Sequence, residues 1–268
     1  RRSSDLLTEP LYNRAWFNYN RRAMLGMGSQ RANDGWNPYV SAEFARFNLT
    51  GLTEDLSLAW SALYVVVTMS NSILHDIDIY KTADVSEEAV NAAKGEALLM
   101  RGVAYFYLLR GWGDVILFEN NDDAVSVPVR PLNTEASVLE FVIRDFEDAA
   151  ELLPEKGTNK HASKYAAKAL LAKALLAQSG WAKGATRDAE ILDRVVELCD
   201  DVINNGPYQL LDDYENLFRP QYNDNDETVL AMRWAKPSTG EWGSMNALFS
   251  DLAFSETTDV RVWGGSLV

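Results

Sequence analysis

The sequence predicts a mainly α-helical protein whose helices are joined by short loops into antiparallel hairpins. Three observations support this. Apolar residues recur at steps of three and four, capping residues precede these periodic segments, and Gly or Pro residues end them. Alanine is concentrated on one face of several segments, which allows close helix contacts. From Lys236 onward the periodicity fades, so the C-terminal part is predicted to be irregular and rich in loops.

An amphipathic first helix is predicted over residues 11–27, where aromatic residues alternate with basic ones. Residues 28–51 have no periodicity and are dense in Asn, Asp, Gly, Pro and aromatic residues. A loop of this length is usually functional or disordered, and its aromatic residues argue against disorder. We therefore expect a long, structured loop.

A long second helix is predicted to begin at Thr53, which can cap it ahead of two acidic residues. Asn71 stands in the middle of its apolar face. Asn71 could bind a ligand, but a buried amide hydrogen-bonded to a loop backbone is the favoured interpretation.

Residues 96–118 form the most strongly patterned stretch. Small and aromatic residues follow one face of the predicted helix over residues 96–111, and a second apolar stripe lies opposite, so other helices should flank it. Its charged Glu96 and Arg101 are expected to pair with neighbouring helices or to reach solvent. Gly111 and Gly113 should end the helix, and a short buried extended segment should follow.

Three further helices are predicted downstream. Ser137 has capping-box spacing to Glu140 and opens a helix that ends before Pro154, and Ser163 opens an alanine-rich helix. The third contains Cys199, which is expected to be a small buried hydrophobic residue. Beyond it we predict a short turn and helix over residues 208–218 and a strand over residues 228–234.

The net charge of −14, from 25 basic and 39 acidic side chains, argues against binding to nucleic acid or to anionic membrane surfaces. One cysteine and two histidines exclude an intrachain disulfide and a His/Cys zinc set. The sequence contains no run of about 18 apolar residues, so it predicts no membrane-spanning helix. The irregular end of the sequence, over residues 262–268, leads us to expect a fragment of a longer protein.

The sequence lacks the common catalytic motifs, including the nucleophile elbow, the P-loop and the His-Glu-x-x-His pattern. A glycosidase needs only two carboxylates, so composition leaves that alternative open. His75 is interpreted as a hydrogen-bonded helix-end histidine. Residues 223–227 carry oxygen ligands suited to calcium but lack EF-hand spacing, and a solvated turn is favoured. We expect no catalytic residue, metal or cofactor.

Aromatic rings interleaved with amides and acids suit a sugar, because apolar C–H faces stack on rings while polar groups bind hydroxyls. The loop over residues 28–51 and a later Gly-flanked tryptophan offer this mixture, and the candidate ligand-binding residues are Asn33, Asp34, Trp36, Asn37, Tyr39 and Trp242. An equally weighted alternative is that Trp36 and Tyr39 plug the loop against the helices.

The order of motifs in residues 96–118 resembles the SusD/RagB family signature. The matching steps are Glu96-Ala97, Arg101-Gly102, Tyr105-Phe106-Tyr107 and Trp112-Gly113-Asp114. Gly102 replaces the alanine that is usual in the family. The resemblance implies tetratricopeptide-like hairpins packed into a superhelical array over residues 1–235, followed over residues 236–268 by the start of an irregular, truncated C-terminal region.

The resemblance also implies a function. SusD-like proteins are surface-exposed lipoproteins of the outer membrane that bind oligosaccharides or polysaccharides without catalysis and deliver them to a TonB-dependent, SusC-like transporter. The only membrane attachment implied is an N-terminal lipid anchor that this sequence does not contain. A helical-repeat scaffold that binds another protein is the main alternative, and a helical glycosidase is a less favoured one.

Overall fold

The computed structural model describes residues 7–12, 16, 18–36, 40–122, 129–157, 161–222 and 225–232. These parts of the chain contain helices and no named strand, which confirms the mainly α prediction. The chain divides into two compact units. Unit 1 contains residues 1–8 and 67–231, and unit 2 contains residues 9–66 and 232–268. The predicted boundary after residue 235 lies outside the described residues and stays a prediction.

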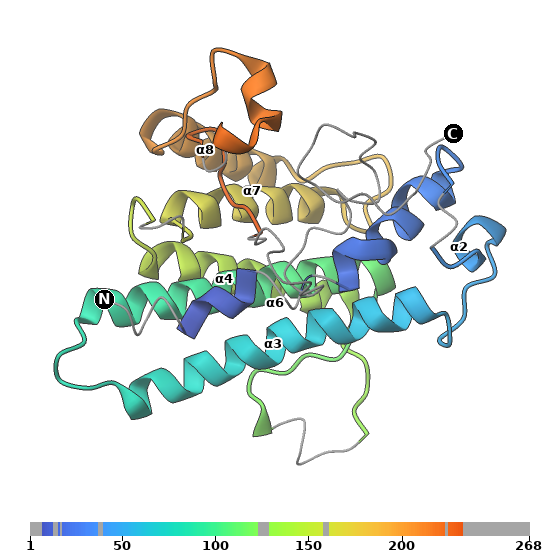
Figure 1. The fold of residues 1–268 in the computed structure, drawn as a ribbon, viewed down its shortest axis with the longest axis horizontal. Coiled ribbons are helices and arrows are strands. Elements are labelled where there is room, and N and C mark those ends of the chain that lie inside the picture. The colour runs from blue at the N-terminus through green and yellow to red at the C-terminus, as the bar shows by residue number, and fades with distance from the viewer. Residues whose placement is uncertain are drawn as a thin grey trace. The chain divides into compact units, whose positions relative to one another are not determined.

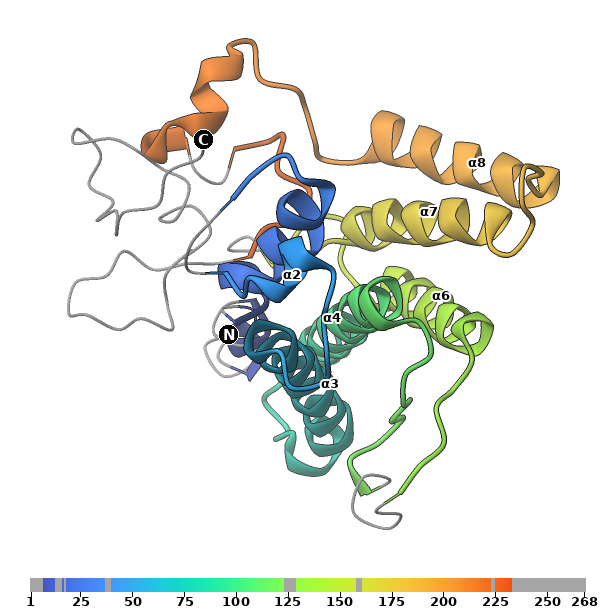
Figure 2. The same cartoon turned by 90° about the vertical axis from the view of Figure 1, so that its right-hand side faces the viewer.

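Unit 1 is a stack of antiparallel helices (Figure 1). It contains the C-terminal half of α3 (Glu54–Tyr80), then α4 (Glu87–Trp112), α6 (Glu135–Leu152), α7 (Lys164–Gly180) and α8 (Ala189–Asn205). α4 packs on α6, α6 on α7 and α7 on α8, as Figure 2 shows in a second view. Each helix thus packs chiefly on its neighbours in sequence, as tetratricopeptide-like hairpins do.

Side-chain caps fix where the helices of unit 1 begin. Ser163 caps α7 as predicted, with its hydroxyl accepting a hydrogen bond from the Ala166 N–H. The prediction for α6 was wrong by one turn, because Thr134 is the cap and Ser137 donates its N–H to it. A contact distant in sequence explains this shift: Asn133 pairs with Val115 immediately before the helix.

The end of α4 follows the prediction in part. Gly111 is still helical, whereas Gly113 has a φ of 77°, a conformation that glycine adopts without strain. Val115 then lies fully buried and forms an isolated antiparallel bridge with Asn133. The predicted short buried extended segment is thereby confirmed at Val115.

α4 is buried on most sides, and its glycines allow α6 and the chain after it to approach closely. A Cβ at Gly102 would lie 2.6 Å from the Phe146 ring, and one at Gly95 would lie 2.7 Å from Leu153. The glycine at position 102 is therefore matched to the bulky Phe146. Tyr107, on the small-residue stripe, is only half-buried.

Two predictions in the last part of unit 1 were wrong. Cys199 is exposed, because α8 covers α7 with one face and contains no buried residue. Residues 228–232 form no strand, although Gln209 donates its N–H to the Asp226 carbonyl nearby. Residues 233 and 234 of the predicted strand lie outside the described residues.

Unit 2 begins with helical turns of unusual pitch. A 3₁₀-helix covers Glu9–Tyr12, and π-helical turns cover Tyr19–Ala23 and Gly26–Gln30. The helical backbone continues to Ala32, so the predicted loop starts later than residue 28. The loop also contains a short helix, α2 (Glu43–Arg46).

By length and composition alone, α3 could cross a membrane, since an 18-residue window has a mean hydropathy of 1.4. The core helix of a globular protein passes the same test, so this support for a span is weak. α3 also carries Asp55, Ser70 and Asn71 as buried polar residues. The sequence analysis predicted no membrane span in this helix, because polar residues interrupt its apolar run.

Candidate functional site

The loop that contains the candidate residues is anchored at one end by a glycine. Phe44 of α2 is fully buried, and a Cβ added to Gly26 would lie 2.5 Å from its ring. Only a residue without a side chain leaves room for this contact. Gly26 therefore fixes α2 against the π-helical turn Gly26–Gln30.

The other end of the loop is anchored to the first turn of α3. Asp55 is 2% exposed and accepts two hydrogen bonds from Ser41, one from the backbone N–H and one from the hydroxyl, both at 2.7 Å. Thr53 uses its hydroxyl to accept a bond from the Thr50 N–H at 3.1 Å. The helix begins after Thr53 as predicted, while the Thr53 side chain also holds the preceding loop.

Between these anchors, Asn33, Asp34 and Trp36 lie at the surface. Asn33 adopts a left-handed conformation with a φ of 60°, and the Asp34 N–H donates to the Ser29 carbonyl at 3.1 Å. Both side chains are exposed, and Trp36 is 46% exposed. Trp16, by contrast, is 2% exposed and occupies the core of the same unit. Asn37, Tyr39 and Trp242 lie outside the described residues.

Sequence reasoning missed a further exposed ring in this loop. Phe47 is 64% exposed and has a φ of 55°, which is uncommon for a bulky residue. The Arg31 guanidinium carbon lies 5.0 Å from the Phe47 ring centroid, within cation–π range. The signal was available in the sequence, because Phe47 precedes an Asn in the same aromatic-rich loop.

The motif-bearing helix of unit 1 carries a different kind of polar group. Arg101 donates two hydrogen bonds to Asp145, at 2.8 and 2.7 Å, and a third to the Asn71 side-chain carbonyl at 2.8 Å. Asn71 in turn donates to the Phe118 carbonyl at 3.1 Å, so the prediction of a buried amide bound to loop backbone is confirmed. We call Arg101, Asp145 and Asn71 the buried network.

The buried network is structural in character. Burial by itself lowers the pKa of Arg101, but the hydrogen bonds and charge of Asp145 outweigh it, so the pKa lies above its ordinary value.

Glu96, the second charge on α4, contacts His161 at 2.9 Å. Both predicted pairings with neighbouring elements are therefore confirmed.

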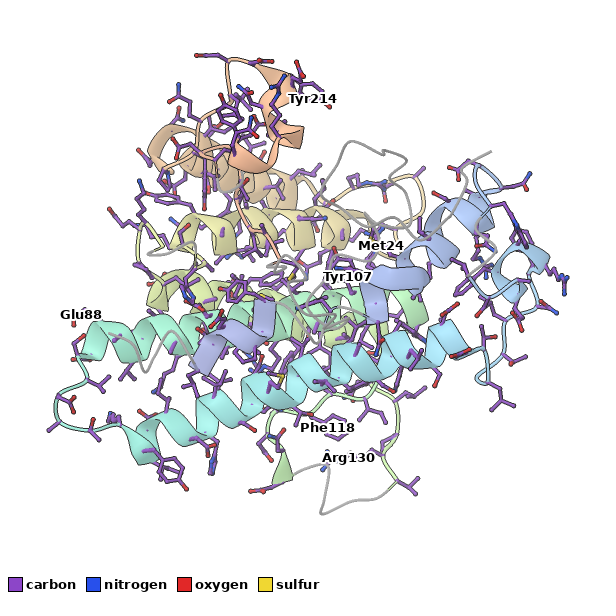
Figure 3. The ribbon with its side chains drawn as sticks, in the orientation of Figure 1. Met24, Glu88, Tyr107, Phe118, Arg130 and Tyr214 are labelled. Atoms are coloured by element: carbon purple, nitrogen blue, oxygen red, sulfur yellow. The ribbon has the colours of Figure 1, made fainter. Side chains whose placement is uncertain are left out.

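The network also orders the chain after α4. The Phe118 N–H donates to the Tyr105 hydroxyl at 2.8 Å, and the Arg130 guanidinium carbon lies 5.6 Å from the Phe118 ring centroid (Figure 3). His75, exposed on α3, contacts Asp76 at 2.9 Å, and this neighbour raises its pKa through a hydrogen bond. These polar side chains are thus committed to partners within the protein.

Nothing in the described residues brings three or more His, Cys, Asp or Glu side chains together as a metal site would require. In the candidate calcium cluster, Asn223 and Asp224 lie outside the described residues. The Asn225 side-chain carbonyl accepts hydrogen bonds from Glu227 and Thr228, the geometry of a tight turn.

Comparison with known proteins identifies the class to which this scaffold belongs. Residues 12–176 match the SusD-like family described as starch-binding and associating with the outer membrane. That description defines a class of carbohydrate-binding proteins associated with the outer membrane. A SusD-like protein of Bacteroides ovatus is 46% identical over 97% of this chain. The chain belongs to the SusD-like family.

Solved structures agree with this assignment. One, described as containing a xylogluco-oligosaccharide, is 46% identical to this chain and has a TM-score of 0.84. The match covers 94% of this chain and 50% of the chain in that structure. A laminarin-binding SusD-like protein is 18% identical with a TM-score of 0.70, over 92% of this chain and 54% of its own, and shows the shared fold alone. The chain spans 47% of the Bacteroides ovatus protein.

Proposed function

We propose that this chain binds oligosaccharides through the loop over residues 28–51 and does not hydrolyse them. The observation that carries the proposal is the half-exposed Trp36 ring, held in a loop that is fixed at both ends. A fixed loop loses little conformational freedom when a ligand binds. The exposed ring is therefore suited to binding rather than to packing.

The chemistry of this loop fits a sugar. A pyranose presents C–H groups that stack on an indole ring, and its hydroxyls need donors and acceptors. Asn33 and Asp34 are exposed beside Trp36 and offer both. We propose that Asn37 and Tyr39 extend this surface and that Trp242 adds a second ring.

The ligand class is proposed from a relative. The structure that contains a xylogluco-oligosaccharide shares 46% identity with this chain, which supports a related plant-type oligosaccharide as the ligand. The lack of catalytic motifs and the membership of a carbohydrate-binding family support capture without turnover. We further propose a surface location on the outer membrane, a lipid anchor, and delivery to a SusC-like TonB-dependent transporter.

The test is calorimetric titration with xylogluco-oligosaccharides, with malto- and laminari-oligosaccharides as competitors for specificity. Trp36→Ala should weaken the preferred interaction by about 1–3 kcal/mol, by analogy with base stacking on aromatic rings, and leave the melting temperature nearly unchanged. Trp16→Ala is the control, since removal of this buried ring should cost roughly 3–5 kcal/mol of stability.

Two outcomes would contradict the proposal. A large loss of stability in Trp36→Ala without selective loss of affinity would show that the ring supports the core. Sustained release of reducing ends, abolished by replacement of a single carboxylate, would establish a glycosidase instead. Delivery is tested separately, by isolating a complex between this protein and a SusC-like transporter.

A further inference from the structure

We propose that unit 1 carries a second binding site, for a sugar that bears a carboxylate, at the C-terminal ends of α4 and α7. The site is a hollow of about 270 Å³. It is lined by Arg110, Leu176, Ala177, Gly180, Trp181 and Arg187. We call it the two-arginine hollow. Because binding sites for drug-sized ligands span about 300–1,000 Å³, this volume suits one sugar unit.

The two arginines of the hollow have no carboxylate partner among the described residues. Within the described residues, neither Arg110 nor Arg187 forms an ion pair with a carboxylate: Arg110 lies 5.8 Å from the Phe106 ring centroid, and Arg187 donates to two backbone carbonyls. Elsewhere, arginines such as Arg194 and Arg219 pair with acids. In a chain with a net charge of −14, two such guanidinium groups at one hollow favour an anionic ligand.

The backbone is shaped to hold one of these groups. A Cβ added to Gly180 would lie 2.7 Å from the Arg187 guanidinium carbon, so the guanidinium occupies the space of a missing side chain. Its bonds to the Gly184 and Thr186 carbonyls both use Nη1. Within the described residues, Nε and Nη2 have no protein acceptor and can bind a carboxylate.

Trp181 and its neighbours supply the apolar part. The Trp181 Nε1–H donates to Glu135 at 2.8 Å, so the one polar atom of the ring is already committed. What Trp181 offers the hollow is carbon surface, which the exposed Leu176 extends. A ring beside cations suits a hexuronic acid, since the pyranose can stack while its carboxylate binds arginine.

A larger hollow at the turn between α3 and α4 lacks this property. Its volume is about 570 Å³, and Lys81 and Lys94 both contribute to its lining. Both ammonium groups contact Asp78, at 3.3 and 2.6 Å, and Glu87 also lines this hollow, so two carboxylates balance the two lysines. The two-arginine hollow is therefore the better candidate of the two for binding an anion.

The test is titration of the protein at low salt with glucuronate, followed by calorimetry and ligand-observed NMR, with glucose and acetate as comparison probes. Glucuronate should bind, glucose and acetate should bind at least about tenfold more weakly, and added salt should weaken the glucuronate complex. Arg187→Gln should reduce glucuronate affinity about tenfold, because it removes charge-assisted hydrogen bonds.

Gly180→Ala gives a second variant that keeps every charge. Its new methyl group should displace the Arg187 guanidinium and weaken glucuronate binding without lowering the melting temperature. Arg219→Gln is the matched control, since it removes one exposed positive charge from a residue that does not line the hollow. Its affinity for glucuronate should equal that of the parent protein.

Several results would overturn the inference. These are no glucuronate binding at millimolar concentration, equal affinity for glucose or acetate, or equal losses in Arg187→Gln and Arg219→Gln. The inference is independent of the proposed function. Because one unaltered protein is titrated with glucuronate and with a neutral xylogluco-oligosaccharide, failure of either proposal is seen without reference to the other.

Discussion

The buried network around Arg101 and the exposed loop around Trp36 use similar residue types in opposite ways. In the network, charged and amide groups are removed from water and bound to one another, with Arg101 6% and Asp145 1% exposed. In the loop, the amide of Asn33, the acid of Asp34 and the ring of Trp36 face solvent, and Gly26 and Asp55 anchor the two ends. The comparison teaches that protein partners, more than residue type, separate a framework from a candidate binding surface.

The largest expected effect is at the network. Arg101→Leu leaves Asp145 buried without its partner, and loss of one member of a buried ion pair costs about 3–5 kcal/mol. Urea unfolding followed by circular dichroism measures this change. Arg144→Leu is the control, because the Arg144–Glu119 pair is exposed and such pairs contribute about 0–1 kcal/mol. Equal losses in the two variants would remove the distinction between network and surface.

A smaller effect is expected where the loop is anchored. Gly26→Ala places a methyl group against the Phe44 ring and should destabilise the protein by about 1–3 kcal/mol, as overpacking does. It should also weaken oligosaccharide binding if the anchor positions Trp36. Gly28→Ala is the matched control, because nothing lies within 4 Å of its added Cβ. A thermal melt of Gly26→Ala that matches the parent protein would show that the anchor is dispensable.

The smallest effect is expected on α8, which is regular in backbone but exposed in side chains. Cys199→Ser should change the free energy of unfolding by less than about 0.5 kcal/mol, as surface substitutions usually do. Chemical unfolding of the two proteins side by side measures the difference. A loss above about 1 kcal/mol would mean that Cys199 is packed after all, as the sequence had indicated.

Local sequence predicted most of the helical framework, because periodicity and caps are local properties. Ser163 and the pairing roles of Asn71 and Arg101 were anticipated correctly. Periodicity shows which residues share a face but not whether another element covers that face. Cys199 was therefore expected to be buried, whereas it is exposed.

The error at the start of α6, and the exposure of Trp36 that the sequence left open, have nonlocal causes. Two hydroxyl residues, Thr134 and Ser137, could each begin α6, and the pairing of Asn133 with Val115 selects the earlier one. The exposure of Trp36 likewise depends on how Gly26 and Asp55 hold the loop. The composition of the loop suggested a sugar-binding chemistry, which stays a prediction, and the sequence alone left burial and exposure of the ring equally weighted.

The order in which the helices of unit 1 pack has a consequence for how the chain folds. α4, α6, α7 and α8 each contact mainly the next helix in sequence, so most contacts close short loops. Helical topologies with such local contacts fold rapidly, on the order of microseconds to milliseconds in small domains. Each hairpin can form as soon as its two helices are available, which limits the time during which the apolar faces are open to aggregation.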